Sequence, residues 1–239
     1  MAVMCAEQWQ PAPKSLSLPE NGVHVWRAGL NSVSLEFLSA DEREKAAQFH
    51  FDKNRNQYVA ARGVLRQLIG RYENLPPGAI QFSYNSFGKP GLEQSSLRFN
   101  ASHSGSLGLF AFARNRNIGV DLERIRPDLA TREIAAQFFS DDEITGLRGL
   151  PAESHTAAFF ACWTRKEAFI KAHGSGLSLP LDKFVVSLAA PARLLRTDFD
   201  PKAMQDWTLH DLNPGEEYAA ALAVEGQPQR IDCWQWERD

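Results

Sequence analysis

The order of helix and strand signals in the first half of the chain recurs in the second half. Ser39-Ala-Asp-Glu42 and Ser140-Asp-Asp-Glu143 both have the pattern of a capping box, in which a serine and a glutamate three residues later satisfy open amides at a helix start. The two boxes lie 101 residues apart. A longer helix is predicted after each box, at about residues 53–72 and 154–173. The recurrence favours a fold built from two similar units.

The two longer helices share a second pair of residues. Arg62 and Gly70 correspond to Lys166 and Gly174 at a spacing of 104 residues. Chance similarity between two amphipathic helix pairs is the alternative explanation. Residues 10–22, with three prolines, predict an irregular lead-in. Apolar runs with turn residues around them predict short strands near residues 23–27, 80–84, 97–102, 107–114, 184–188, 207–212, 218–224 and 231–236.

We therefore predict an α+β fold, made of a pseudo-twofold pair of similar α+β halves. Each half is expected to be a small, mainly antiparallel sheet packed on helices. The turn at residues 115–117 leads into the strand after it, so the halves are expected at residues 1–115 and 116–239. Because ligand sites favour such interfaces, we expect the active site between the halves.

Composition and charge exclude several classes of protein. The chain has 239 residues, 44% of them hydrophobic and 23% charged, as in an ordinary globular protein. A net charge of −3 gives no general attraction to nucleic acid or anionic membrane, and no apolar run approaches the roughly 20 residues that span a bilayer. The N-terminus lacks a secretion signal, and Cys5, Cys162 and Cys233 lack metal-ligand spacing. We expect a cytoplasmic protein with reduced thiols that binds neither nucleic acid nor membrane.

Two acids lie on one face of a predicted strand near the junction of the halves. In Ile118-Gly-Val-Asp-Leu-Glu123, the acids are two positions apart, so a strand directs both side chains to the same face. The alternative is the solvated face of an edge strand, because exposed carboxylates are the default. Apolar residues at positions 110–113, 118 and 120 favour an interior strand instead.

A glutamate and a lysine lie one turn apart on the longer helix of the second half. In Trp163-Thr-Arg-Lys-Glu-Ala-Phe-Ile-Lys171, Glu167 and Lys171 share one helix face, and a surface ion pair is the alternative interpretation. This helix is apolar nearly all round, so charges within it need a reason. Trp163 is interpreted as core packing and Lys166 as a flanking charge.

Three carboxylates that are buried together raise one another's pKa, and a hard cation such as Mg²⁺ relieves that conflict. Asp121, Glu123 and Glu167 are the candidates, and Lys171 beside them is suited to hold a phosphate. The pattern therefore predicts phosphoryl transfer. The sequence shows no activated serine or cysteine nucleophile that would indicate a covalent intermediate.

The same residues resemble the signature of a known family. Gly-x-Asp-x-Glu followed by Trp-x-x-Lys-Glu-Ala-x-x-Lys is similar to the pattern of the 4′-phosphopantetheinyl transferases, in their large surfactin-synthetase-activating class. Four further blocks extend the resemblance over residues 39–186: Phe-Gly-Lys-Pro (87–90), Asn-Ala-Ser-His-Ser-Gly (100–105), Phe-Phe-Ser-Asp-Asp-Glu (138–143) and Gly-Leu-Ser-Leu-Pro-Leu (176–181). The resemblance implies a pseudo-twofold enzyme with coenzyme A in the cleft between its halves.

The resemblance assigns roles to the acidic residues and the lysine. It implies that Asp121, Glu123 and Glu167 bind Mg²⁺, with Mn²⁺ as the alternative metal. Glu167 is also the leading candidate for general base, and Lys171 is expected to contact the pyrophosphate. Asp121 and Lys171 are therefore expected to face coenzyme A as well as the metal.

The resemblance also assigns residues to coenzyme A, the expected substrate. Ser102 and His103 are expected to clamp its phosphates and nucleotide, and Lys89 to lie at the adenine–ribose end. Lys45 is expected to bind the 3′-phosphate. The chain departs from the pattern at Glu42, where some relatives have a second lysine, and Arg62 is a candidate to compensate.

Glu143 matches a glutamate of the family, but its place in a capping box favours a helix cap.

The implied activity is transfer of 4′-phosphopantetheine from coenzyme A to a serine of an apo acyl or peptidyl carrier protein. Two alternatives remain: another Mg²⁺-dependent transferase that uses a nucleotide, and a non-catalytic module that binds carrier proteins. The chain has no Gly-x-x-x-x-Gly-Lys-Ser/Thr loop and no kinase signature, which disfavours the first. A monomer is expected.

Overall fold

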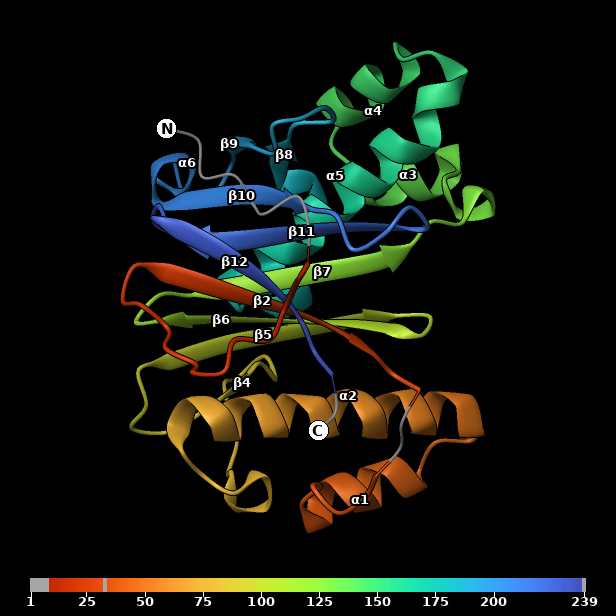
Figure 1. Cartoon of the computed structure of the whole chain (residues 1–239). Coiled ribbons are helices and arrows are strands. Elements are labelled where there is room, and N and C mark those ends of the chain that lie inside the picture. The colour runs from red at the N-terminus through yellow and green to blue at the C-terminus, as the bar shows by residue number, and fades with distance from the viewer. Residues whose placement is uncertain (1–8, 32–33, 238–239) are drawn as a thin grey trace.

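The chain folds into four layers, with two β-sheets between two long helices (Figure 1). The computed structural model describes residues 9–31 and 34–237. One long helix covers the outer face of a five-stranded sheet, a three-stranded sheet packs on the inner face, and the second long helix covers the other side. The predicted α+β class is confirmed.

Both long helices and most of the predicted strands lie where the sequence signals place them. The helical elements are α1 (Ala40–Ala47), α2 (Asp52–Glu73), η1 (Pro77–Ala79), η2 (Pro127–Leu129), α3 (Arg132–Phe138), α4 (Asp141–Arg148), α5 (Ala152–His173), η3 (Gly176–Ser178), η4 (Leu181–Lys183) and α6 (Ala203–Asp206). The strands are β1 (Gln10–Pro11), β2 (Gly22–Gly29), β3 (Ser83–Tyr84), β4 (Pro90–Gly91), β5 (Leu97–Ser104), β6 (Leu107–Arg114), β7 (Ile118–Arg124), β8 (Phe184–Val186), β9 (Leu194–Thr197), β10 (Trp207–Leu212), β11 (Tyr218–Glu225) and β12 (Arg230–Gln235). Both capping boxes begin helices, as predicted.

The strand order shows how the halves are joined. The five-stranded sheet has the order β1-β12-β2-β6-β5, and the three-stranded sheet has the order β10-β11-β7. Division at residue 115 separates the antiparallel strands β2, β6 and β5 from β7, β11 and β10. It does not describe β12, which follows residue 116 and pairs in parallel with β2 of the first sheet. The lead-in is not wholly irregular, because β1 pairs with β12.

Alternating faces of the strands build three apolar cores. On β2, Val23 and Val25 face the core between the sheets, while Trp26 and Ala28 face the core beneath α2. On β7, the odd-numbered positions face α5 and the apolar ones face the central core. A third core lies around α5 and the segments that cover it. The acidic residues of β7 therefore point toward α5 and leave the central core apolar.

The two long helices correspond to each other at a spacing of 100 residues. Each has 22 residues, and each ends at a left-handed cap, Asn74 (φ 53°) for α2 and Gly174 (φ 80°) for α5. The predicted spacing of 104 is wrong by about one helical turn. Arg66, and not Arg62, is the counterpart of Lys166.

A buried ion pair anchors α4 to α5. Lys166 is fully buried, and its Nζ lies 2.8 Å from Glu143 Oε2. Glu143 also accepts hydrogen bonds from the amides of Ser140 (2.9 Å) and Val186 (2.8 Å). Lys166 donates to the carbonyl of Leu181 (2.8 Å). The predicted cap role of Glu143 is confirmed, but Lys166 is wrongly interpreted as a flanking charge, because its partners come from distant segments.

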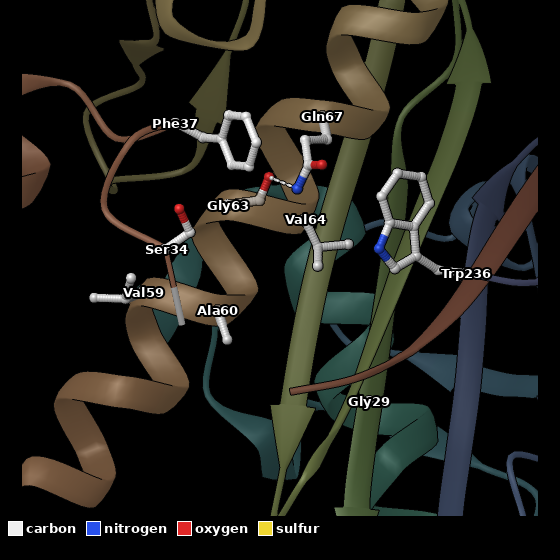
Figure 2. A pocket seen from close by; sticks show the side chains of 9 residues that line it. All are labelled: Gly29, Ser34, Phe37, Val59, Ala60, Gly63, Val64, Gln67 and Trp236. Carbon is white, nitrogen blue, oxygen red and sulfur yellow. Dashed lines mark hydrogen bonds between the residues drawn. The ribbon is translucent and has the colours of Figure 1, made fainter. Parts of the chain in front are cut away.

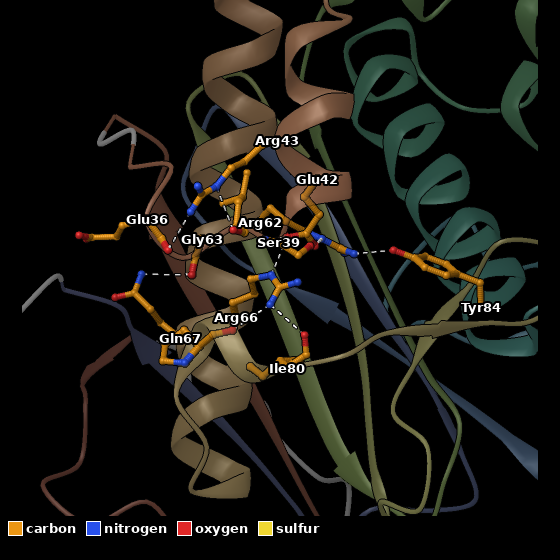
Figure 3. A network of polar contacts seen from close by, with 12 residues as sticks. Glu36, Ser39, Glu42, Arg43, Arg62, Gly63, Arg66, Gln67, Ile80 and Tyr84 are labelled. Carbon is orange, nitrogen blue, oxygen red and sulfur yellow. Dashed lines mark hydrogen bonds and ion pairs between the residues drawn. The ribbon is translucent and has the colours of Figure 1, made fainter.

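The first half contains an equivalent pair with arginine in place of lysine (Figure 3). Arg66 Nε lies 2.6 Å from Glu42 Oε2, and both side chains are almost fully buried. Glu42 also accepts from the amide of Ser39 (3.1 Å) and from Arg62. Arg62 stacks over the ring of Phe82, with 4.2 Å between the guanidinium carbon and the ring centroid. Glu42 thus occupies an internal position, where it holds α1 to α2.

Two further expectations concern the surface and the thiols. No helix among the described residues is long and apolar enough to cross a membrane. Cys162 and Cys233 are buried, and burial raises the pKa of the Cys162 thiol, which disfavours its reactive thiolate form. Cys5 and the rest of residues 1–8 lie outside the described residues.

We predict that Lys166→Met destabilises the protein by about 3–5 kcal/mol, because it leaves Glu143 as a buried charge without its partner. Urea unfolding of both proteins measures the difference. Lys183→Met is the control, because Lys183 is half exposed and its ion pair with Asp182 lies at the surface. A change below about 1 kcal/mol for Lys166→Met would show that the pair contributes little.

Candidate active site

The two sheets meet at their edges through side chains of one strand and amides of the other. Along β5, alternate side chains point toward β7 and accept hydrogen bonds from alternate amides of β7. The three bonds join Val120 N to Asn100 Oδ1 (2.9 Å), Leu122 N to Ser102 Oγ (3.3 Å) and Arg124 N to Ser104 Oγ (3.0 Å). We call these three bonds the β5–β7 ladder. It satisfies amides of an edge strand that would otherwise lack partners within the protein.

The serines of the ladder also hold the two acids of β7. A serine hydroxyl accepts and donates at once, so each serine that receives an amide can pass its own proton onward. Ser102 Oγ donates to Asp121 Oδ1 (3.0 Å), and Ser104 Oγ donates to Glu123 Oε2 (3.1 Å). The ladder therefore orients both carboxylates on the face that α5 covers.

Gly119 allows α5 to lie directly on β7. A Cβ atom at this position would lie 2.2 Å from the carbonyl oxygen of Ala168 and 2.3 Å from the amide nitrogen of Ala172. These are backbone atoms of α5 and cannot move aside cheaply, so only glycine fits. The close approach brings Glu167 and Lys171 of α5 beside the acids of β7.

Lys171 forms the central ion pair of the site. Its Nζ lies 2.6 Å from Asp121 Oδ1 and 3.0 Å from Ser102 Oγ. The side chain of Asp121 is 4% exposed and that of Lys171 is 29% exposed, so the pair is anchored inside and reaches outward through the lysine. The other carboxylate oxygen of Asp121, Oδ2, is buried and has no hydrogen-bond partner.

The remaining carboxylates are held in an environment that disfavours their charge. Burial raises the pKa of Glu123, and the neighbouring charges of Asp121 and Glu167 raise it further, against the hydrogen bond from Ser104. Burial also raises the pKa of Glu167, again with a contribution from Asp121 and with opposition from Lys171. The three acids thus lie close enough to repel one another, as the sequence predicts.

This donor set suits a hard cation, although the carboxylates are not arranged around one point. In the part of the chain that the structure describes, no group of three or more His, Cys, Asp or Glu side chains has metal-ligand geometry. Asp121 Oδ1 already accepts hydrogen bonds from Lys171 and Ser102. The buried and unpartnered Oδ2, next to two carboxylates of raised pKa, fits an added positive charge.

The residues expected at coenzyme A lie in three places. His103 is at an odd-numbered position of β5, and partial burial and the charge of Lys171 lower the pKa of its imidazole. Lys45 is exposed on α1, with its Nζ 5.5 Å from the centroid of the Tyr58 ring. Lys89 is partly buried and donates to two backbone carbonyls. Of these three, only His103 has a pKa that the charge of Lys171 affects.

Sequence reasoning missed Asn100 and Ser104 as members of the site. Both belong to the block Asn-Ala-Ser-His-Ser-Gly, and their spacing of two residues from Ser102 was the available signal. A polar residue at every second position of an otherwise apolar strand indicates one polar face. What that face contacts could not be known before β5 and β7 were placed edge to edge.

Comparison with known proteins decides the family. A family model described as "4'-phosphopantetheinyl transferase superfamily" matches residues 117–223, and one described as "4'-phosphopantetheinyl transferase, N-terminal" matches residues 26–114. The 4'-phosphopantetheinyl transferase HetI of Nostoc sp. is 36% identical over 98% of this chain and 100% of its own length. The chain belongs to the 4′-phosphopantetheinyl transferase family.

A second transferase supports the same assignment. The 4'-phosphopantetheinyl transferase Sfp of Bacillus subtilis is 31% identical over 87% of this chain and 92% of its own length. Among solved structures, the Thermotoga maritima holo-[acyl-carrier-protein] synthase aligns with a TM-score of 0.37 at 18% identity, over 46% of this chain and 63% of that chain. The two relatives HetI and Sfp, which align with 98% and 87% of this chain, confirm the family resemblance of the sequence motifs.

We predict that Glu167→Gln is more stable than the wild type at neutral pH without divalent cations. An acid whose pKa is raised in the folded state loses stability as pH rises through that pKa, because the folded protein disfavours the charged form. The stability advantage of the variant should therefore grow as pH rises above about 4.3, the ordinary pKa of glutamate, and level off above the raised pKa. Urea unfolding in EDTA across pH 5–8 measures it. A variant less stable than wild type at pH 7 would contradict the repulsion.

Proposed function

We propose that this protein transfers the 4′-phosphopantetheine group of coenzyme A to a serine of an apo acyl or peptidyl carrier protein, with release of adenosine 3′,5′-bisphosphate. The observation that carries the proposal is the Lys171–Asp121 ion pair, with Glu123 and Glu167 beside it, in a chain of this family. The carrier serine oxygen attacks the phosphorus that bears the pantetheine, and the nucleotide leaves.

Lys171 supplies fixed positive charge to the leaving group. Its ammonium is held by Asp121 and Ser102 and remains partly exposed, so it can reach a phosphate without leaving its partners entirely. Ser102 and Asp121 direct the ammonium before substrate arrives. A preoriented charge of this kind stabilises a transition state more than a mobile one, because no reorganisation is needed during the reaction.

Glu167 is the proposed general base. Its raised pKa makes it a stronger proton acceptor than an exposed glutamate. Burial and the charge of Asp121 are the causes of this shift. Glu167 accepts the proton of the carrier serine, and the serine oxygen becomes the nucleophile.

Asp121, Glu123 and Glu167 are the residues that would hold Mg²⁺, with Mn²⁺ as the alternative. The bound ion supplies positive charge to the pyrophosphate. Ser104 holds Glu123 toward this cluster through its hydrogen bond, and Ser102 does the same for Asp121. The buried Oδ2 of Asp121 is the oxygen left available for such a ligand.

The first half of the chain, residues 1–115, is proposed to hold the nucleotide of coenzyme A. Ser102, which accepts a hydrogen bond from Lys171, and its neighbour His103 on β5 are the proposed phosphate contacts. Lys45 is the proposed contact of the 3′-phosphate. Arg62 is less suited to that task, because its guanidinium is engaged by Glu42 and Tyr84.

Residues 116–239 are proposed to supply the metal and catalytic groups. One chain contributes both halves of the site, which supports a monomeric enzyme. A cytoplasmic location is part of the same proposal. The proposed partners are coenzyme A and the carrier protein, with no role for nucleic acid or membrane.

Mass spectrometry of an apo carrier protein tests the function directly. Incubation with the enzyme, Mg²⁺ and coenzyme A should add one phosphopantetheine group to the carrier, and the nucleotide product should appear in equal amount. A carrier in which the acceptor serine is replaced by alanine is the control. An unchanged carrier mass, with several unrelated apo carriers and either metal, would refute the proposal.

We predict that Lys171→Ala lowers kcat by about 10²–10³-fold, the usual loss when one group that stabilises developing charge is removed. Lys171→Arg should recover part of the loss, because the positive charge stays while its geometry changes. Steady-state kinetics with saturating carrier protein and coenzyme A give both values. If Lys171→Ala keeps its kcat and loses only stability, the pair with Asp121 is structural.

A further inference from the structure

The loop Asn85–Lys89 of the first half covers the C-terminal end of α5 in the second half. Asn85 Nδ2 donates to the carbonyl of Gly174 (2.9 Å). Lys89 Nζ donates to the carbonyl of Ala172 (2.9 Å) and to the carbonyl of Ile118 (3.1 Å). These three bonds connect segments that lie between 29 and 89 residues apart in the chain.

Hydrogen bonds within the loop define its conformation. Asn85 Oδ1 accepts hydrogen bonds from the amides of Phe87 (3.0 Å) and Lys89 (2.9 Å). The amide of Gly88 donates to the carbonyl of Asn85 (3.0 Å), with Gly88 in the left-handed region at φ 82°. One asparagine therefore both closes the turn and contacts α5.

Lys89 donates a hydrogen bond to a carbonyl at the C-terminal end of α5. The last carbonyls of an α-helix lack partners within the helix, and the helix dipole adds partial negative charge there. The ammonium of Lys89 satisfies Ala172, in the last turn of α5, and burial lowers its pKa to about 8. A lysine ammonium that has lost much of its hydration needs hydrogen-bond acceptors within the protein, because burial of an unpaired charge is costly.

The second acceptor of Lys89, the carbonyl of Ile118, connects the lysine to the strand that contains the acids. Ile118 is the first residue of β7, and Ala172 directly follows Lys171 on α5. One ammonium thus connects the strand that contains Asp121 to the helix that contains Lys171. The distance between these two elements sets the Lys171–Asp121 ion pair of 2.6 Å.

We infer that Lys89 is a positioning residue, which holds α5 against β7 so that Lys171 and Glu167 stay in register with Asp121. This inference rests on the proposed function and replaces the expectation that the Lys89 side chain binds the adenine–ribose end of coenzyme A. Two of the three N–H groups of the ammonium are already used within the protein. The nucleotide is then bound without the Lys89 side chain.

The test compares Lys89→Met, Lys89→Arg and a control, Lys183→Met. Methionine keeps the length of the apolar stem and removes the ammonium, while arginine keeps the charge. Lys183 is a half-exposed lysine whose ion pair with Asp182 is local. Lys89→Met should lower kcat by about tenfold or more, because small displacements of catalytic groups are costly. Lys89→Arg should recover much of it, and Lys183→Met should match wild type.

Calorimetric titration separates positioning from binding. The Kd of coenzyme A should change less than about twofold in Lys89→Met, since a lost charged contact to a ligand would cost about tenfold or more. Lys45→Ala, which removes the proposed 3′-phosphate contact, provides the comparison. A tenfold weaker Kd for Lys89→Met with unchanged kcat would overturn the inference, and so would no change in either constant.

Amide hydrogen exchange gives a readout that does not need activity. Lys89→Met should speed exchange in the last turn of α5 and at the start of β7, while Lys89→Arg and Lys183→Met should not. Unchanged exchange in Lys89→Met would overturn the positioning role. If the wild type fails to modify any carrier protein, the proposed function fails, and the exchange experiment still decides whether Lys89 holds these two elements together.

Discussion

The β5–β7 ladder is the contact on which the site depends. The two sheets pack face to face around an apolar core, and that packing alone would leave the amides along the β7 edge without partners. Here Asn100, Ser102 and Ser104 accept those amides, so the edges meet through side chains. The same serines then orient Asp121 and Glu123. Ser102 and Ser104 therefore have two roles: they accept hydrogen bonds from the amides of the β7 edge, and they orient the two carboxylates.

The pseudo-twofold relation also explains why the site occurs once among the described residues. Matching the register of β2 and β6 to that of β7 and β11 puts Trp26 and Ala28 where β7 has Asp121 and Glu123. On α2, Gln67 occupies the position equivalent to that of Glu167 on α5. It lines a cavity of about 90 Å³, together with Trp236 (Figure 2). The edge of β2 is occupied by β12, so His210, the counterpart of Asn100, has a buried Nε2 without a partner.

The sequence predicts features that depend on neighbouring residues, but it does not predict contacts between segments that are far apart in the chain. Both capping boxes, both long helices and the acidic strand follow from neighbours in sequence. The predicted helix spacing is wrong because Arg62 and Arg66 are one turn apart and equally basic, and only the burial of Arg66 against Glu42 distinguishes them. Lys166 was misjudged because its partners lie on other elements. The parallel pairing of β12 joins residues about 200 positions apart, which no local signal reports.

The sequence by itself determined which side chains share a face: Asp121 with Glu123 on a strand, and Glu167 with Lys171 on a helix, because these follow from periods of two and of about four residues. Only the tertiary structure decided which face meets which. Gly119 lets α5 approach β7, and the approach pairs Lys171 with Asp121. It likewise gave Lys89 two carbonyls of the other half as acceptors. The reason is physical: a side chain's partner depends on burial and on contacts between distant segments, and neither is encoded by spacing along the chain.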